Sequence, residues 1–495
     1  MAEHFIPRET AEGDLLAAAA YLAETIGSAD GYAEAMSAVV PLYLKRGDVD
    51  TAAELANTVD DSFTRDRLLT QVAEKCAELN DDEYATQLAE AVEDVGLRSE
   101  AYERVALKKA LAGQFDIARD MASEISHPEF VFAGIAVKQA EDGDAVGANA
   151  TLNTIEFPNA RVHASLEIAT AMIAAGNVDA AAAHLENAAV AAAEIEHNEE
   201  RLRALVDVGN AFIDANRNDR AAETFEKVRS EAETLDNMHR DAFMGAAAVG
   251  LFRAGDLKLA DRALDLVGDK TQTATCLLGY AREYWRREER SDAMDALEEA
   301  YAILKSQRES ETRNSKARYA LFTSIAAQFA GFEKGERAIE IAHGIEVESD
   351  QTAALIQVAE ILTLRKEDEQ ARHALQAIAD DANRAFALIR MSDARVKNGD
   401  ASGAGELLNE AAHLAETVPQ LSSRSTAYNA IASRYAAGGE KEKAAEISQT
   451  NLRTIGTIRD ESRRVTALTE VAELFADADI ELSGGLRESV ARLLG

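Results

Sequence analysis

The chain has 495 residues, of which 47% are hydrophobic and 28% are charged, so it can bury a sizeable core and is not expected to be disordered. Acidic residues number 88 against 52 basic ones, which gives a formal net charge of -36 at pH 7. A surface of this sign repels phosphate backbones, so the composition excludes nucleic acid as an expected partner. The acidity and the preference for arginine over lysine fit two sources equally, a salt-accumulating halophile or a GC-rich genome.

The N-terminal segment shows neither a signal peptide nor a membrane span. Its first ten residues, MAEHFIPRET, lack a basic region followed by an apolar stretch. The longest strongly apolar run, LLAAAAYLA (15–23), is too short to cross a bilayer. We therefore expect a cytoplasmic protein with no membrane partner.

Helix-forming residues dominate the rest of the chain. There are only five prolines, and alanine forms runs such as AAAAHLENAAVAAAEIE (180–196). Alanine loses no rotamer entropy when it becomes helical, so such runs favour helix. No segment has the pattern of a strand, and the sequence predicts an all-α protein.

One alanine recurs along the chain at intervals of 30 to 45 residues, and we call these positions the anchor column. They are Ala52, Ala85, Ala118, Ala148, Ala181, Ala221, Ala260, Ala293, Ala338, Ala371, Ala404 and Ala444. Twelve residues before each anchor lies a second column, the small column, with a small residue at eleven of its twelve positions. It comprises Val40, Ala73, Ala106, Ala136, Ala169, Gly209, Ala248, Ala281, Ala326, Ala359, Ser392 and Ala432.

A third column marks a turn. Seven residues after the small column the chain has glycine at 47, 113, 143, 176, 255, 399 and 439, and asparagine at 80 and 216. Both residue types tolerate the left-handed conformation that ends a helix. The three columns together predict twelve helical hairpins in which two helices cross closely at the small and anchor residues. A single hairpin cannot bury its apolar face, so the hairpins must stack into an α-solenoid.

The spacing also predicts where the stack is irregular. Residues 32–458 hold the twelve hairpins, while 1–31 and 459–495 fit the columns poorly and are expected to be degenerate capping helices of one continuous solenoid. The longest interval contains AILKSQRESETRNSKARYAL (302–321), which predicts longer helices or a longer loop. At position 288 a glutamate takes the place of the turn glycine, so we expect that first helix to run on.

These columns resemble the tetratricopeptide repeat. In LVDVGNAFIDANRNDRAAETFEKV (205–228) the bulky, small and aromatic residues of that family are matched by Leu205, Val208, Gly209, Phe212, Ala221, Phe225 and Val228. The match covers nearly the whole chain and identifies the superfamily without a subfamily. The resemblance implies a superhelical stack of about twelve hairpins that binds proteins or peptides in a groove lined by the first helices.

No motif in the sequence indicates catalysis. The chain has no GxxxxGK[ST] loop, HExxH pair, CxxC pair or GxSxG elbow, and its histidines are dispersed. The two cysteines, Cys76 and Cys276, fall in apolar helical patterns and are expected to be buried reduced thiols. We therefore predict no cofactor, no metal site and no enzymatic activity.

A basic and aromatic cluster stands out in the segment AREYWRREER (281–290), which holds the only tryptophan of the chain. On the resemblance, residues one and four positions after the small column face the groove. This places Arg282 and Trp285 in the groove, with Arg286 beside them. The neighbouring first helix adds Phe252 and Arg253. We therefore predict a partner-binding site at these five residues.

Two alternatives stay open for this site and for the chain. The alternative is that the arginines of the segment pair with Glu283, Glu288 and Glu289 on a solvated helix, as the arginines of charged helices usually do. The leading functional hypothesis is a non-enzymatic scaffold or adaptor that binds a protein or peptide of unknown identity. The alternatives are a structural protein that self-assembles into homo-oligomers or filaments through its end repeats, and an enzyme that uses the solenoid as a cradle.

Overall fold

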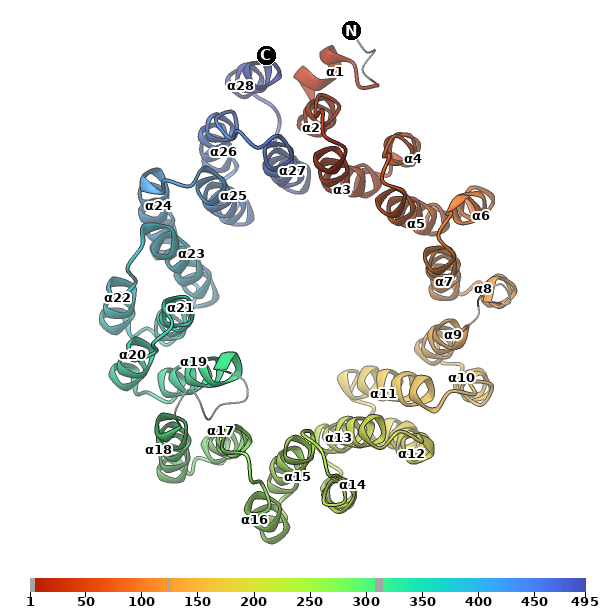
Figure 1. Ribbon diagram of the computed structural model, residues 1–495, viewed down its shortest axis with the longest axis vertical. Helices are drawn as coiled ribbons and strands as arrows, with labels where there is room; N and C mark the ends of the chain where they lie inside the picture. The colour runs from red at the N-terminus through yellow and green to blue at the C-terminus, as the bar shows by residue number, and fades with distance from the viewer. Residues whose placement is uncertain (1–4, 123–124, 126, 308–314) are drawn as a thin grey trace. The chain divides into compact units, whose positions relative to one another are not determined.

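The computed structural model describes residues 5–122, 125, 127–307 and 315–495, and every regular element in this part of the chain is a helix. The prediction of an all-α fold is confirmed. The chain divides into two units, residues 1–101 with 333–495 (unit 1) and residues 102–332 (unit 2). Within each unit, first and second helices of successive hairpins form two layers (Figure 1).

Unit 1 contains the beginning and the end of the chain. Its helices are α1 (Arg8–Gly13), α2 (Leu15–Ala23), α3 (Ala29–Arg46), α4 (Val49–Asn57), α5 (Ser62–Glu78), α6 (Asp82–Ala91), the first turns of α7 (Val95–Leu111), α20 (Gly335–His343), α21 (Glu348–Leu364), α22 (Asp368–Gln376), α23 (Asp381–Lys397), α24 (Ala401–Thr417), α25 (Leu421–Ala437), α26 (Lys441–Ile455), α27 (Glu461–Ala478) and α28 (Gly484–Leu494).

Unit 2 is continuous in sequence. It holds the rest of α7 and α8 (Phe115–Ala122), α9 (Glu129–Glu141), α10 (Ala145–Leu152), α11 (Pro158–Ala174), α12 (Val178–Glu194), α13 (Asn198–Asp214), α14 (Asn218–Ala232), α15 (Arg240–Ala254), α16 (Leu257–Asp265), α17 (Lys270–Arg286), α18 (Arg290–Ser306) and α19 (Ser315–Gly331).

The columns of the sequence coincide with the hairpins from α3/α4 to α25/α26. All twelve anchor alanines are at most 3% exposed, and the small column is equally buried. All twelve turn positions have a positive φ, including Glu288, Glu333 and Lys366, where the residue type does not signal a turn. The register of twelve hairpins is therefore confirmed. After several of these turns an aspartate caps the second helix, as Asp256 does by accepting from Leu259 N at 3.1 Å.

The expectation that the first helix runs on at Glu288 is wrong. Helix α17 ends at Arg286, and Glu288 has a φ of 66°. Two backbone hydrogen bonds close the turn, from Glu288 N to Trp285 O at 3.1 Å and from Glu289 N to Tyr284 O at 2.9 Å. These bonds satisfy the last helical carbonyls and hold a non-glycine residue in the left-handed region.

Replacing Glu288 by glycine is expected to stabilise the chain by about 0.5 to 1 kcal/mol, because glycine adopts the left-handed conformation without a Cβ penalty. The midpoint of urea unfolding should rise. The reverse change at the matching turn of the preceding hairpin, Gly255→Glu, should lower it. A lower midpoint for Glu288→Gly would show that the side chain stabilises the turn in another way.

The longer intervals of the repeat come from the second helices. Most first helices are close to 17 residues long, as in α11, α13 and α17, whereas α9 in the shortest interval has 13. Second helices have 9 residues in α16 and α22, where the interval is 33, but 17 in α12 and α24, where it is 40. In the longest interval α18 also has 17 residues, and the part of the polar segment at 308–314 lies outside the described residues.

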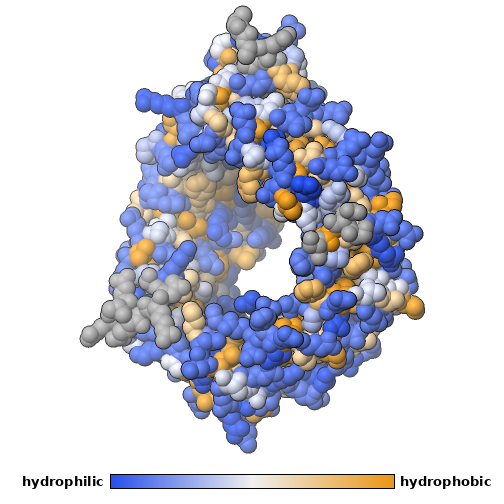
Figure 2. Space-filling model, turned by 45° about the vertical axis from the view of Figure 1, so that its right-hand side comes forward, coloured by the Kyte–Doolittle hydropathy of each residue, from blue (hydrophilic) through white to orange (hydrophobic). Residues whose placement is uncertain are grey.

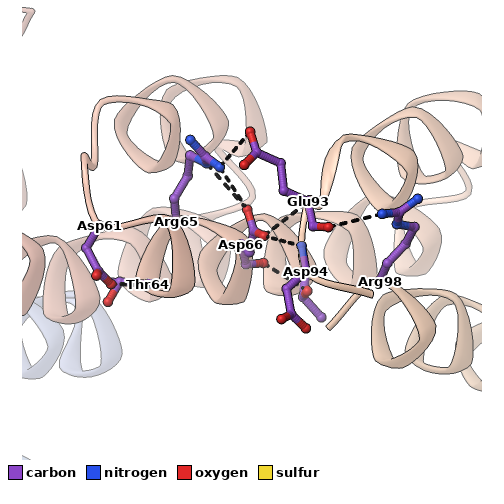
Figure 3. A network of polar contacts seen from close by, with 8 residues as sticks. Asp61, Thr64, Arg65, Asp66, Glu93, Asp94 and Arg98 are labelled. Carbon is purple, nitrogen blue, oxygen red and sulfur yellow. Dashed lines mark hydrogen bonds and ion pairs between the residues drawn. The ribbon is translucent and has the colours of Figure 1, made fainter. Parts of the chain in front are cut away.

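Aspartates on the first helices join successive hairpins. Asp66 is 1% exposed, and its Oδ2 accepts from Glu93 N at 2.9 Å and from Asp94 N at 2.8 Å in the connection to the next hairpin (Figure 3). Arg65 lies over this carboxylate, with Nη2 3.3 Å from Asp66 Oδ1. In unit 2, Asp241 Oδ2 accepts in the same way from Gly268 N at 3.0 Å and from Asp269 N at 2.7 Å in the next connection. The carboxylates thus bond the backbone of each connection to the preceding first helix.

An arginine column supports the same connections. Eight residues before a small-column residue, several arginines donate to the carbonyl that ends the preceding second helix. These include Arg98 to Glu93 O at 3.1 Å, Arg201 to Ile195 O at 2.7 Å and Arg424 to Val418 O at 2.6 Å. The guanidinium fork suits such carbonyls, so part of the arginine excess has a structural role.

The two ends of the chain pack on each other within unit 1. Helix α2, whose side chains are almost all buried, packs against α27, and α27 also packs against α3 (Figure 1). Lys45 Nζ lies 2.9 Å from Glu473 Oε1 and 2.7 Å from Asp477 Oδ1. Helices α27 and α28 keep the hairpin order, with a left-handed turn at Asp479. The assignment of 1–31 and 459–495 as capping segments stays a prediction.

Candidate functional site

The five predicted site residues lie in unit 2, on the consecutive first helices α15 and α17. The site also includes the start of α18 and the end of the α19 segment, because side chains from both contact α17. The backbone turn after α17 positions Arg290 beneath the tryptophan, with Arg290 Nη1 donating to Trp285 O at 3.2 Å.

Phe252 belongs to the core of this junction. Its side chain is 2% exposed, and its ring stacks on Tyr280 with centroids 4.1 Å apart and meets Tyr284 edge-on at 4.9 Å. Arg287 donates to Phe252 O at 2.9 Å and places its guanidinium carbon 5.0 Å from the ring centroid. The ring therefore joins α15 to α17 and is not presented to a partner.

Both faces of the Trp285 indole are covered by the chain itself. Phe332 stacks on it with centroids 4.2 Å apart and planes 6° apart. The guanidinium carbon of Arg290 lies 3.6 Å from the indole centroid. Two groups this close must occupy opposite faces, since they cannot share one volume. Trp285 thus holds the turn after α17 against the end of the α19 segment, and a partner would reach only the edge of its ring.

The arginines differ in how much of the guanidinium is free. Arg253 Nη1 donates to Asn210 Oδ1 at 2.8 Å on the preceding first helix. Arg282 Nε lies 2.8 Å from the amide oxygen of Gln328 when that amide is turned to accept. Arg282 is nevertheless exposed, and the side chain of Arg286 is 71% exposed. Arg282 and Arg286 are therefore the two predicted residues that reach solvent most fully.

A buried glutamate lies beneath these arginines. Glu283 is 5% exposed and accepts from Arg286 Nη2 at 2.6 Å and from Arg287 Nε at 2.8 Å. Burial raises the pKa of Glu283, but the hydrogen bonds from Arg286 and Arg287 outweigh it, and the net pKa lies below the usual value. The predicted pairing with Glu283 is thus present, and Glu283 holds Arg286 at the surface.

The residue one position after the small column contacts the next first helix in several hairpins, although Arg282 at this position remains exposed. That these residues line a groove stays a prediction. A Cβ added at Gly279 would lie 2.8 Å from Val249 Cγ2, and Asp393 Oδ2 accepts from Arg434 Nη2 at 3.0 Å. Arg282 contacts Gln328 in the same way. The sequence columns locate the crossing within a hairpin, but the spacing between hairpins decides which side chains are covered.

The face of the molecule seen in Figure 2 is largely hydrophilic, with apolar residues scattered among the hydrophilic ones. Over the described ranges, no three His, Cys, Asp or Glu side chains are grouped so that they could hold a metal ion. No helix in the same part of the chain is long and apolar enough to cross a membrane. Cys76 and Cys276 are free and buried, as predicted, and burial raises the pKa of the Cys76 thiol to about 11.

Comparison with known proteins finds only distant structural neighbours. No protein-family model and no curated protein matches the sequence. Among solved structures, the Ton1535 protein of Thermococcus onnurineus is 17% identical, with 71% of this chain and 97% of that chain covered and a TM-score of 0.25. The Cut9–Hcn1 complex of the APC/C is 12% identical, with 93% of each chain covered and a TM-score of 0.22.

A circular tandem repeat protein is 15% identical, with 94% of this chain and 90% of that chain covered and a TM-score of 0.15. These low scores carry no functional information. The fold assignment rests on the chain's own buried columns and left-handed turns. On that geometry the chain is an all-helical repeat protein built from stacked helical hairpins.

Proposed function

We propose that the chain is a non-enzymatic scaffold that binds a carboxylate-bearing segment of a partner protein at α17. The observation that carries the proposal is the exposure of Arg282 and Arg286 on one face of α17, beside the edge of Trp285. A guanidinium presents paired donors that match a carboxylate, and arginine and tryptophan dominate the energetics of many interfaces. The chain has a net charge of -36, so most of its surface is acidic. A local group of exposed arginines differs from that surface in charge, and acidic residues would keep the position solvated equally well.

The rigid support of these arginines strengthens the proposal. Glu283 anchors Arg286, and Gln328 anchors Arg282 when its amide is turned to accept, so less side-chain entropy is lost when a partner binds. The neighbouring stack of Trp285 between Phe332 and Arg290 fixes the backbone that carries both arginines.

Changing Arg282 and Arg286 together to alanine is expected to reduce capture of the partner at least tenfold while leaving the fold intact. Trp285 is kept, because its stacking makes it structural. The measurement is quantitative mass spectrometry of proteins retained by a tagged chain from lysate of its own cells at native salt. The control changes two other exposed arginines, Arg453 and Arg492, to alanine.

The proposal is supported by proteins whose capture falls in the first variant and not in the control. Equal capture by both variants would assign the arginines a purely structural role. Turnover of a small molecule by the purified chain, with no protein retained, would favour the enzyme alternative. Self-assembly through end repeats has less support, because α2 and α27 already pack on each other within unit 1.

A further inference from the structure

The interior of the twelfth hairpin, α25/α26, departs from all the others. Seven residues after the anchor alanine, the other eleven hairpins carry alanine, valine or isoleucine, as at Val228 and Ile378, whereas this hairpin carries Asn451. Four residues after the anchor the others carry alanine, leucine or phenylalanine, whereas this hairpin carries Ser448. Two polar side chains therefore occupy positions that the fold otherwise reserves for apolar packing.

These side chains are fully enclosed and have no protein partner. Asn451 is 0% exposed, and neither its Oδ1 nor its Nδ2 has a hydrogen-bond partner among the described residues. Ser448 and Ser425 are each 1% exposed, and their hydroxyl oxygens are equally unpaired. Serines in helices usually donate to the carbonyl one turn earlier, as Ser433 does in the same helix α25 at 2.8 Å.

The antiparallel register of the hairpin brings the three side chains to the same end. Helices α25 and α26 cross where Ala432 and Ala444 are buried. Ser425 lies seven residues before that crossing on one helix, and Asn451 lies seven residues after it on the other, so the two lie at the same level. Ser448 is one turn from Asn451 on the same face of α26. The register thus brings one buried amide and two buried hydroxyls to the same end of the hairpin.

We propose that this site binds at least one ordered water molecule inside the twelfth hairpin. An unpaired buried amide is costly, and buried polar groups in proteins are almost always satisfied by protein or by water. The ligand must accept from Asn451 Nδ2 and donate to Asn451 Oδ1. A water does both, whereas a metal cation would satisfy only the oxygens. Internal waters typically make two to four such bonds.

The test is a crystal structure of the full chain at a resolution that shows ordered water, with crystals grown in sodium and in rubidium salts. The expected result is a density peak within about 3.2 Å of Asn451 and at least one of the two serine hydroxyls, with no anomalous signal in rubidium. An anomalous peak there would show that a monovalent cation occupies the site, and it would overturn the proposal of a water. Absence of any peak, with the three groups bonded to one another, would overturn the proposal.

Variants keep the inference testable in solution. In protein with 15N-labelled asparagine, the side-chain amide of Asn451 is expected to show a water cross-peak whose sign indicates a residence time longer than tumbling. Asn451→Val removes that amide and assigns the signal. Ser448→Ala should weaken the cross-peak, whereas Ser433→Ala, which removes a hydroxyl already bonded within its helix, should leave it unchanged. If Ser448→Ala left the cross-peak unchanged, the Ser448 hydroxyl would not be a ligand of the water.

Discussion

Replacing Leu16 by aspartate is expected to detach α2 from α27 and to lower the free energy of unfolding of unit 1 by about 3 to 5 kcal/mol. Leu16 is 0% exposed in a helix whose neighbours include α27 and α28, so the change puts an unpaired carboxylate into an apolar contact. Urea unfolding followed by circular dichroism gives the free energy. The matched control is Leu257→Asp, because Leu257 is 48% exposed, and it should change stability by about 0.5 kcal/mol or less.

Detachment itself is measured with spin labels at two exposed positions near the junction, Thr25 and Glu481. Labelling is selective because both native cysteines are buried. The distance between the labels should lengthen in Leu16→Asp and stay unchanged in Leu257→Asp. The ion pairs of Lys45 across the junction are half-exposed, so added salt should have little effect. If the free energy of unfolding of Leu16→Asp equalled that of the wild type, α2 would not pack on α27.

Replacing Gly250 by alanine is expected to destabilise unit 2 by about 3 kcal/mol. The ring of Phe225, which is 1% exposed, inserts between the first helices α13 and α15. A Cβ at position 250 would lie 2.4 Å from three of its ring carbons, and one at Gly209 would lie 2.7 Å from the nearest. Such distances are too short for carbon atoms, and the packed core leaves little room for the ring to move.

A double-mutant cycle separates this clash from the general effect of alanine. Phe225→Leu alone should destabilise, but the double variant Gly250→Ala/Phe225→Leu should lose less stability than the sum of the two single changes. Gly405→Ala is the matched control, because nothing lies within 4 Å of a Cβ there, and it should stabilise α24 by about 0.5 to 1 kcal/mol. Strict additivity in the cycle would show that Phe225 is not what limits position 250.

The candidate site was only partly accessible to sequence reasoning. The repeat register correctly placed Arg282 and Trp285 one turn apart on one helix and identified Glu283 as an ion-pair partner. It did not reveal that Trp285 is covered, since Phe332 lies 47 residues further on and meets it only because hairpins stack. The structural roles of Asp66 and Arg98 were also missed, although the fixed offset of each residue from the small column is a periodic signal.

The sequence by itself determined the all-helical class, the twelve crossings and nine of the twelve turns, because small residues and left-handed glycines act within one hairpin and repeat with a local period. Only the tertiary structure decided the turns at Glu288, Glu333 and Lys366, the covering of Phe252, and the packing of α2 on α27. These features depend on contacts between hairpins or between the chain's ends. The run LLAAAAYLA shows the reason, since it is apolar on every side and its pattern cannot specify which distant helix will bury it.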